Sequence, residues 1–410
     1  MPPPPDPTLP SEVPQAIENT IAKWERWEAD HSIYEGDHTE QVRLSSRVLK
    51  GLMYRPTGAI VAAATTSLPE TIGGERNWDY RFTWIRDASL TLEALYIGTC
   101  SDEAQNFVSW LAGTAGAHVH GDNPLQIMYG ITGQRDLTER ILPHLRGWRN
   151  SAPVRIGNGA WTQTQLDVYG EFLCALGLYV DKLGKLEGTL GHFVEDLADT
   201  VLREWRQPDA GIWEMRAEPR HHLSSKLLCW AALDRAVKLA AHTGNQGRVD
   251  EWSRQRDEIR EAIFTRGWSE KRGAFAQSFD SDDLDASALL MPLVDFLPAT
   301  DERMAATIEA IRDELTEHGM VLRYRSADGL EGSEGTFVIC TFWLVRCLAL
   351  MGDLERANEL FDHVTGYASD LGLLAEEIDT TTGELLGNYP QAFSHIGLIT
   401  AAWELDKAKT

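Results

Sequence analysis

Two glutamates lie in loop-like segments that suit acid–base chemistry. Glu214 follows Trp213 in a Gly-Ile-Trp-Glu turn flanked by apolar residues, and desolvation in such a setting favours the protonated form of a carboxyl group. Glu376 precedes a second carboxylate, Glu377, and a turn-like Asp-Thr-Thr-Thr-Gly segment. The first carboxyl therefore suits a general acid and the second a general base. Judged by these residues alone, a solvated loop charge remains the commoner alternative for each.

Paired carboxyl groups on separate loops are what inverting glycoside hydrolysis requires. The two groups stand about 6.5 to 9.5 Å apart, one protonating the leaving oxygen and the other activating a water molecule on the opposite face. Aromatic or charged residues recur in five loop segments, at 75–80, 158–161, 209–214, 323–325 and 376–379. Indole rings among them could stack on sugar rings, although many Trp residues are simply core residues.

Other catalytic chemistries have weaker support in the sequence. His118 and His120 could face one way on a strand, and His221 and His222 are adjacent, but neither pair has partners at zinc-ligand spacing. There is no GxSxG elbow, P-loop or strand-associated GxGxxG motif. The sequence therefore predicts neither a metal nor an organic cofactor.

The elements that must carry these loops are long amphipathic stretches. Their apolar residues recur every three or four positions, which predicts α-helices. The expected helices cover roughly residues 11 to 30, 40 to 53, 86 to 97, 102 to 117, 164 to 182, 191 to 206, 222 to 243, 246 to 263, 300 to 314, 335 to 351, 353 to 366 and 391 to 407.

These helices follow one another in pairs, with a short link inside each pair and longer loops between some pairs. Six antiparallel pairs would form an all-α (α/α)6 barrel, in which an outer ring of helices packs on an inner ring. A helical-repeat scaffold has the same periodicity. The recurrence of aromatic and charged residues in the long loops favours the barrel, because loops on a rigid frame usually carry function.

Composition limits the compartment and the partners. The 410 residues are 43% hydrophobic and 24% charged, as in ordinary globular proteins. No apolar run reaches membrane-spanning length, and the N-terminus has no secretory signal, so we expect a cytoplasmic protein. A net charge of −24 disfavours nucleic-acid and membrane partners and fits a small neutral saccharide. The five cysteines form no CxxC pair and are expected to be buried free thiols.

Five motifs resemble the signatures of glycoside hydrolase family 15, which includes the glucoamylases. The run Asn-Trp-Asp-Tyr-Arg-Phe-Thr-Trp-Ile-Arg-Asp at residues 77–87 is the most specific of them. The others are Gly159-Ala160-Trp161 with Gln165 and Asp167, Trp213-Glu214, Arg323-Tyr324 and Ala375-Glu376-Glu377, while residues 387–395 look like the bacterial branch. The likeness covers roughly residues 50 to 407.

The resemblance implies an (α/α)6 barrel and an inverting exo-hydrolase that releases β-glucose from the non-reducing end without a cofactor. Glu214 would be the acid and Glu376 the base. The resemblance also implies a set of substrate-binding residues. Tyr80 would help to place the water, Trp84 and Trp161 would form walls of the pocket, and Arg86, Asp87 and Arg323 would bind sugar hydroxyls. Trp213 and Glu377 complete the implied set.

Two departures from the family pattern bear on the substrate. Met215 follows the acid where starch-degrading fungal members carry a second glutamate, and only about fifty residues precede the barrel-like region. We expect a proline-rich disordered tail at residues 1–10 and a single catalytic domain at residues 11–410. Isomaltose or another α-1,6-linked saccharide is the first substrate hypothesis, followed by trehalose and then glucoamylase substrates.

Two further functions stay open at this point. A glycoside phosphorylase on a related barrel would replace the water with phosphate, and an inactive sugar-binding protein would have lost catalysis. Retention of both glutamates disfavours the second. The sequence does not indicate an oligomeric state.

Overall fold

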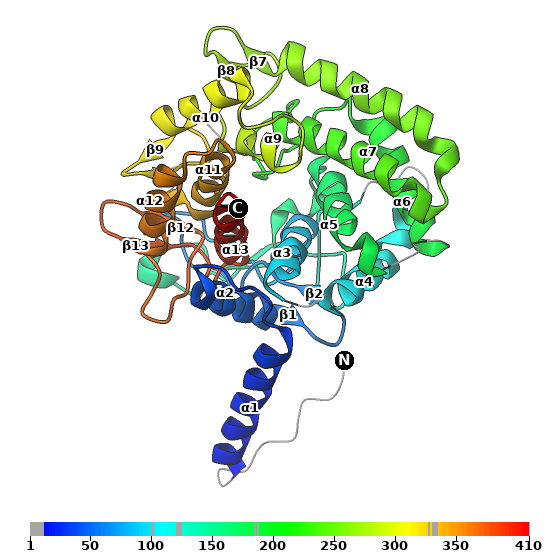
Figure 1. The fold of residues 1–410 in the computed structure, drawn as a ribbon. Helices are drawn as coiled ribbons and strands as arrows, with labels where there is room; N and C mark the ends of the chain where they lie inside the picture. The colour runs from blue at the N-terminus through cyan, green and yellow to red at the C-terminus, as the bar shows by residue number, and fades with distance from the viewer. Residues whose placement is uncertain are drawn as a thin grey trace.

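The computed structural model describes residues 12–99, 102–119, 125–183, 186, 188–326, 329 and 335–409, which form a ring of helices (Figure 1). The predicted tail at residues 1–10 and Cys100 lie outside the described residues.

The helices are α1 (Val13–His31), α2 (Thr39–Gly51), α3 (Ile85–Gly98), α4 (Asp102–Val119), α5 (Asp167–Leu183), α6 (Thr189–Glu204), α7 (Leu223–Thr243), α8 (Val249–Arg266), α9 (Leu290–Leu293), α10 (Glu302–Glu314), α11 (Val338–Leu350), α12 (Leu354–Thr365) and α13 (Ala392–Lys407). Short 3-10 turns are η2 (Trp148–Asn150), η3 (Gly159–Thr162), η4 (Gln246–Arg248) and η5 (Ala286–Leu289).

The strands are only two or three residues long. They are β1 (Met53–Tyr54), β2 (Ala59–Ile60), β3 (Thr83–Trp84), β4 (Met128–Tyr129), β5 (Arg140–Ile141), β6 (Arg155–Ile156), β7 (Trp268–Ser269), β8 (Ala274–Phe275), β9 (Thr316–Glu317), β10 (Met320–Val321), β11 (Thr336–Phe337), β12 (Glu377–Asp379) and β13 (Glu384–Leu386).

An inner ring of helices closes on itself. α3 contacts α5, α5 contacts α7, α7 contacts η5, η5 and α9 contact α11, and α11 contacts α13, which returns to α3. In α11 every residue from Val338 to Ala349 is buried, as expected of a helix that is apolar on all sides. The outer helices bury one face only; α8, for example, buries Trp252, Ile259 and Ile263. The predicted (α/α)6 barrel is therefore confirmed.

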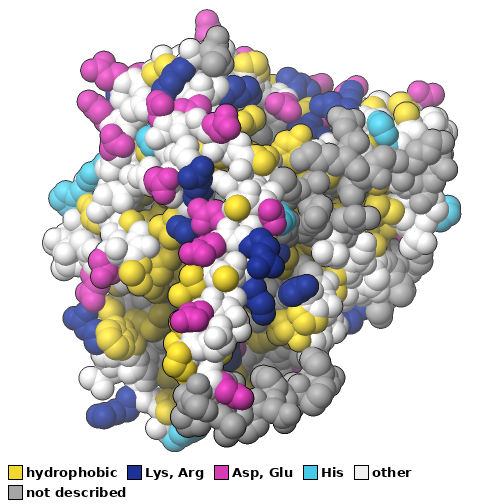
Figure 2. Space-filling model, turned by 60° about the horizontal axis from the view of Figure 1, so that its bottom comes forward, with side chains coloured by type: hydrophobic (Ala, Val, Ile, Leu, Met, Phe, Trp, Pro, Cys, Tyr) yellow, Lys and Arg dark blue, Asp and Glu magenta, His cyan; other side chains and the backbone are white. Residues whose placement is uncertain are grey.

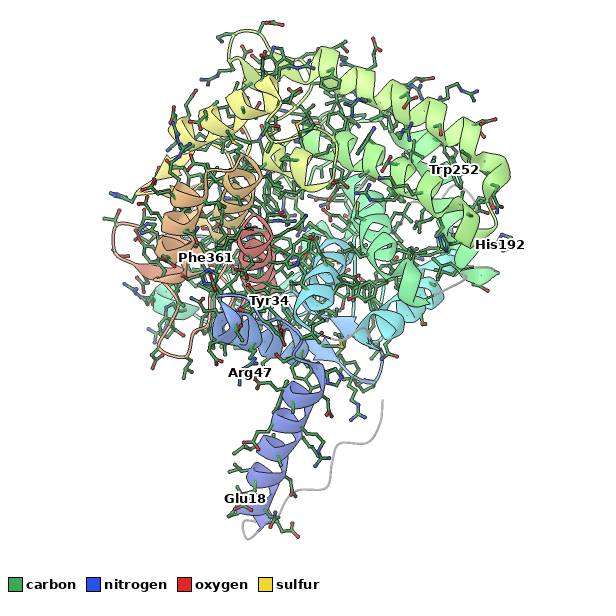
Figure 3. All side chains as sticks on the ribbon, in the orientation of Figure 1. Glu18, Tyr34, Arg47, His192, Trp252 and Phe361 are labelled. Atoms are coloured by element: carbon green, nitrogen blue, oxygen red, sulfur yellow. The ribbon has the colours of Figure 1, made fainter. Side chains whose placement is uncertain are left out.

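Two elements differ from the sequence prediction. The first predicted helix, α1, has no buried residue and extends away from the ring, with Glu18 near its far end (Figure 3). One member of the inner ring, the short pair of η5 and α9, was not predicted from the sequence. Its apolar run is too short to show helical periodicity and contains Pro292, which removes a backbone donor.

Antiparallel strand pairs lie where inner helices begin. β3 pairs with β4 and leads directly into α3, so that Trp84 is the last residue before that helix. β11 leads into α11 and pairs with β12, and Phe337 lies opposite Glu377 in the register. These pairs hold the connecting loops at one end of the barrel.

The surface mixes charges of both signs. On the face that comes forward in Figure 2, acidic and basic side chains are interspersed with hydrophobic ones. Within the described residues, no helix combines the length and the hydropathy that a membrane crossing requires.

Candidate active site

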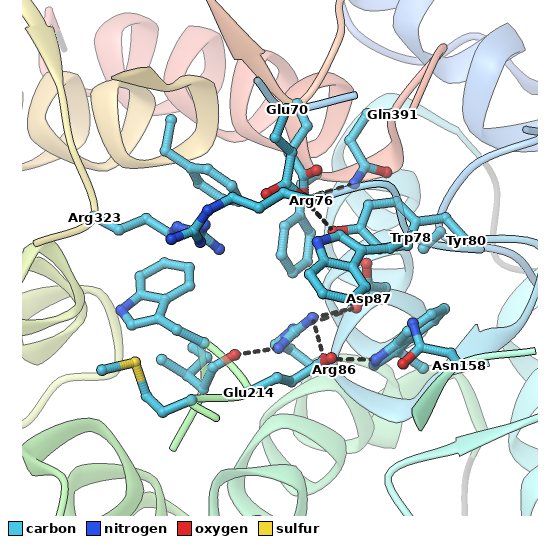
Figure 4. A pocket seen from close by; sticks show the side chains of 18 of the residues that line it. Glu70, Arg76, Trp78, Tyr80, Arg86, Asp87, Asn158, Glu214, Arg323 and Gln391 are labelled. Carbon is cyan, nitrogen blue, oxygen red and sulfur yellow. Dashed lines mark hydrogen bonds and ion pairs between the residues drawn. The ribbon is translucent and has the colours of Figure 1, made fainter. Parts of the chain in front are cut away.

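A cavity of about 680 Å³ opens where the inner helices begin (Figure 4). Most of the residues predicted for the site line it, although they are far apart in the sequence. These are Tyr80, Trp84, Arg86, Asp87, Trp213, Glu214, Arg323 and Glu376. Trp161 and Glu377 are not among the lining residues.

Glu214 is presented by a strained turn. Its φ of +58° is in the left-handed region, which costs a non-glycine residue roughly 1–2 kcal/mol. The turn is held by backbone hydrogen bonds from Glu214 to the carbonyl of Gly211 and from Met215 to the carbonyl of Ala210, both 3.1 Å long. Gly211 also has a positive φ, and a Cβ there would lie 2.7 Å from the His222 ring. Backbone strain of this kind clusters at functional sites.

The carboxylate of Glu214 has polar neighbours on one oxygen. Its Oε1 accepts a hydrogen bond of 2.7 Å from the Trp84 indole and lies 3.5 Å from the Arg86 guanidinium. No described residue forms a hydrogen bond with Oε2. The apolar setting expected from the sequence is therefore only part of the surroundings, and Oε2 is free of protein hydrogen bonds within the described residues.

The buried guanidinium of Arg86 connects several charged and polar groups of the site. Its side chain is 9% exposed, pairs with Asp87 at 3.1 Å and donates to the Ile212 carbonyl in the Glu214 turn. It also stacks on the Phe393 ring, with its guanidinium carbon 4.8 Å from the ring centre. Burial raises the pKa of Asp87 to about 6, although the charge of Arg86 opposes that rise.

Glu376 is more deeply buried than Glu214. Its Oε1 accepts hydrogen bonds from the Tyr80 hydroxyl at 3.1 Å and from the Gln391 amide at 3.2 Å. Its Oε2 is buried and has no hydrogen-bond partner among the described residues. Burial raises the pKa of Glu376 to about 7, while the positive charge of Arg323 and the Tyr80 hydrogen bond act to lower it. A carboxylate with one oxygen fixed and the other unoccupied can accept a proton from water.

Glu214 and Glu376 approach the cavity from different sides. In Figure 4, Glu214 lies across the cavity from Gln391, which binds Glu376. Gly387 makes room beside the second carboxylate, since a Cβ at that position would lie 3.2 Å from Glu376 Oε2. Its φ of +79° also favours glycine.

Glu377 faces away from the cavity because neighbouring residues of a strand point to opposite sides. It is fully buried, accepts a hydrogen bond of 2.8 Å from the Gly335 backbone and lies 3.6 Å from the Arg323 guanidinium. Arg323 in turn lies 4.6 Å from the centre of the Phe337 ring. Glu377 is therefore placed to orient Arg323 rather than to touch a ligand in the cavity.

The two predicted tryptophans on the loops have different positions. The Trp213 indole donates to Asp285 at 3.0 Å and lies against Phe337, with ring centres 5.4 Å apart. Trp161 lies in η3 and packs against the hydrophobic core outside the cavity. The Asn158 cap of this turn lines the cavity instead, because the tight 3-10 turn directs the following indole elsewhere.

Several lining residues were not predicted from the sequence. Trp78 lies inside the recognised signature, and Gln391 and Phe393 lie inside the segment at 387–395, so their motifs could have indicated them. Glu70 has no such signal. Its carboxyl is 3% exposed and lies 3.4 Å from the Tyr80 hydroxyl.

His395 supports the loop that carries Glu376. The imidazole is fully buried, with Nδ1 3.0 Å from the Ser45 hydroxyl and Nε2 accepting from the Leu374 backbone at 3.2 Å. Burial lowers the pKa of His395 to about 3, so the ring stays neutral and can serve as the acceptor.

The histidines that the sequence analysis weighed as weak metal-ligand candidates do not gather in a site that the structure describes. His120 and the side chain of His118 lie outside the described residues. His222 packs under the Glu214 turn, and within the described part of the chain no group of three or more His, Cys, Asp or Glu side chains is arranged to hold a metal. The described cysteines, Cys174, Cys229, Cys340 and Cys347, are free thiols.

A family model described as glycosyl hydrolases family 15 matches residues 36–403. The chain belongs to this family of glycoside hydrolases. It is 45% identical over 413 residues to a trehalase of Mycolicibacterium smegmatis, covering 99% of this chain and 61% of the relative. It is 40% identical over 393 residues to a trehalase of Thermoplasma volcanium, covering 96% and 62%. The chain thus spans about three fifths of the length of these curated relatives.

Solved structures of low sequence identity share the fold. A bacterial glucoamylase complexed with acarbose matches with a TM-score of 0.76 at 15% identity, covering 96% of this chain and 59% of that one. A wild-type glycosidase matches with a TM-score of 0.69 at 20% identity, covering 89% and 96%. Both support the barrel architecture.

Replacing Tyr80 with Phe is expected to move the acidic limb of the pH profile of kcat/KM to higher pH. If Glu376 is the general base, this limb in the wild type should fall near pH 7, because a base must be ionised and burial raises the pKa of Glu376 to about 7. The Tyr80 hydrogen bond stabilises the ionised form, so its removal raises that pKa further.

The control for this measurement is Tyr389→Phe. The Tyr389 hydroxyl bonds to Ser369 at 2.9 Å and has no hydrogen bond to Glu376. Its removal should leave the acidic limb in place. An unchanged limb in Tyr80→Phe, or an equal shift in both variants, would show that Glu376 does not control it.

Proposed function

We propose that this glycoside hydrolase is an inverting α,α-trehalase, with Glu214 as general acid and Glu376 as general base. The observation that carries the proposal is the identity of 40% or more with proteins named trehalase over nearly the whole chain. The α-1,6 preference that Met215 suggested has no comparable support. Trehalose therefore replaces isomaltose as the first substrate.

In the proposed reaction, one glucose of trehalose occupies the inner part of the cavity. Arg86 and Asp87 bind its hydroxyl groups, and the indole of Trp84 and the guanidinium of Arg323 bound the ring. Glu214 protonates the bridging oxygen from Oε2. A water molecule held by Glu376 Oε2 attacks the anomeric carbon and transfers a proton to Glu376 Oε2. The bond between the anomeric carbon and the bridging oxygen breaks, and the second glucose leaves.

The hydrogen bonds at the two glutamates support this division of roles. Tyr80 and Gln391 both donate to Glu376 Oε1, which keeps the ionised form in place while Oε2 remains available to water. Trp84 holds Glu214 by Oε1 only. The second glucose would lie toward Trp78, Asn158 and Arg216, which line the rest of the cavity.

Glu214→Gln and Glu376→Gln should each remain folded and lose about 10²- to 10⁴-fold in kcat on trehalose, the range that proton transfer usually contributes. α-Glucosyl fluoride separates the roles, because fluoride leaves with little need for protonation. Glu214→Gln should keep most of its activity on the fluoride, whereas Glu376→Gln should lose activity on both substrates. Equal losses of Glu214→Gln on both substrates would contradict its role as the acid.

The stereochemistry of trehalose hydrolysis gives a direct test of inversion. Water attack inverts one anomeric centre, and the other glucose leaves with its configuration unchanged, so fresh product should contain equal amounts of α- and β-glucose. Proton NMR before mutarotation measures this ratio. A retaining reaction would release only α-glucose at first, and that result would overturn the mechanism.

A comparison of kcat/KM for trehalose, isomaltose, maltose, isomaltotriose and soluble starch tests the substrate. Trehalose should give the highest value by at least tenfold, in buffers with and without phosphate. A higher kcat/KM for isomaltose than for trehalose would support the α-1,6 preference instead. Turnover only in the presence of phosphate would instead identify a phosphorylase.

A further inference from the structure

The barrel contains a second cavity at the end opposite the active site. It is open to solvent, has a volume of about 1530 Å³ and is lined by residues from the middle and C-terminal parts of the inner helices. Glu93 of α3, His242 of α7, Leu350 of α11 and Lys407 of α13 are among them, whereas the active site is built where these helices start. We call this space the rear cavity.

The charges around the rear cavity are balanced. Four carboxyl groups and four cations line it: Glu93, Glu171, Asp295, Glu404, Arg235, Lys238, Arg346 and Lys407. Most of the cations are engaged already. Arg235 pairs with Asp234 at 2.6 Å, and Arg346 lies 3.4 Å from Glu93 and 3.8 Å from Glu404. Such a lining has no strong preference for an ion of either sign.

Glu171 is the exception to this pairing. It is 5% exposed, lines the rear cavity and forms no hydrogen bond or ion pair with any described residue, although the charge of Arg86 acts on it. A largely buried polar group is stabilised by a hydrogen-bond partner, and a ligand in the cavity could provide one. Burial raises its pKa well above the ordinary value. A protonated carboxyl both donates and accepts hydrogen bonds, which matches the needs of a hydroxyl group.

The walls of the rear cavity provide flat apolar surfaces. Trp343 of α11 is 3% exposed, so only a small part of its indole reaches the cavity. Trp403 of α13 is 37% exposed, and the Lys407 ammonium lies over one face of its ring, 4.8 Å from the ring centre. Leu178 and Leu350, which also line the cavity, are 39% and 37% exposed. Indole rings beside polar groups suit a ligand with one apolar face and a hydroxylated edge.

We propose that the rear cavity binds a neutral saccharide, with Glu171 pairing its hydroxyl groups and the indoles of Trp343 and Trp403 packing against its ring. The balanced charges disfavour a strongly ionic ligand, and the unpartnered carboxyl suits a ligand that donates and accepts hydrogen bonds. The active site on the other side of the barrel is lined by the same combination of carboxyl, guanidinium and indole groups.

One contact links the rear cavity to the active site. Trp343 packs against Trp213, with ring centres 5.9 Å apart and planes tilted by 37°. Trp213 lines the active-site cavity directly before Glu214. A sugar against Trp343 therefore lies one side chain away from the catalytic pocket.

The test measures glucose binding by isothermal titration and ligand-observed NMR, since glucose is not consumed. The active-site cavity is proposed to hold both glucose units of trehalose, so the number of glucose sites is compared between variants. Glu171→Leu, which replaces an unpartnered buried carboxyl with an apolar group of similar size, should bind one glucose molecule fewer than the wild type. Leu90→Trp, which narrows the rear cavity, should also bind one fewer. Asp87→Ala, which removes a group of the active site, should keep the rear site.

The matched control is Glu359→Leu, which removes an exposed glutamate of α12 and should leave the wild-type number of glucose sites. If Asp87→Ala does not fold, the comparison of Glu171→Leu with the wild type still decides. An equal number of glucose sites in Glu171→Leu and in the wild type would overturn the proposal. Tighter binding of glucosamine or gluconate than of glucose at the rear site would overturn the assignment to a neutral saccharide.

Discussion

The buried guanidinium of Arg86 is the interaction on which the catalytic end of the barrel depends. It belongs to the first turn of α3, donates to the backbone of the Glu214 turn and stacks on Phe393 of α13. A buried cation is tolerable only where carboxylates and hydrogen bonds replace its water. Asp87 and Glu214 provide that compensation, and Asp167 adds a further negative influence. The cost of burying one charge thus fixes the relative positions of three segments.

The common direction of the inner helices explains why function gathers at one end. Each inner helix starts near the active site, and the strand pairs β3–β4 and β11–β12 hold the preceding loops there. Residues one helix turn deeper contribute to the barrel interior, and residues near the helix ends reach the rear cavity. Glu171 shows this change along a helix, because it lies one turn after Asp167 on α5 and lines the rear cavity.

Periodicity and motifs predicted the barrel, and eight of the ten residues predicted for the site line the cavity, but these patterns could not predict local direction. Glu377 follows Glu376 in the sequence, yet strand geometry turns it toward Arg323. Trp161 lies in a recognised motif, yet the Asn158-capped turn directs it against the edge of the core, outside the cavity. Glu70 comes from a loop without periodicity or motif, so its place beside Tyr80 depends on tertiary packing alone.

The two catalytic candidates differ in the way their settings constrain them. Glu376 is 4% exposed and held by two donors on one oxygen, so it can change its charge but has little freedom to move. Glu214 is on a strained turn with its side chain 17% exposed. A base must keep one water molecule in line with the anomeric carbon, whereas an acid must follow an oxygen that moves away. Deeper burial for the first and a more exposed side chain for the second match these two demands.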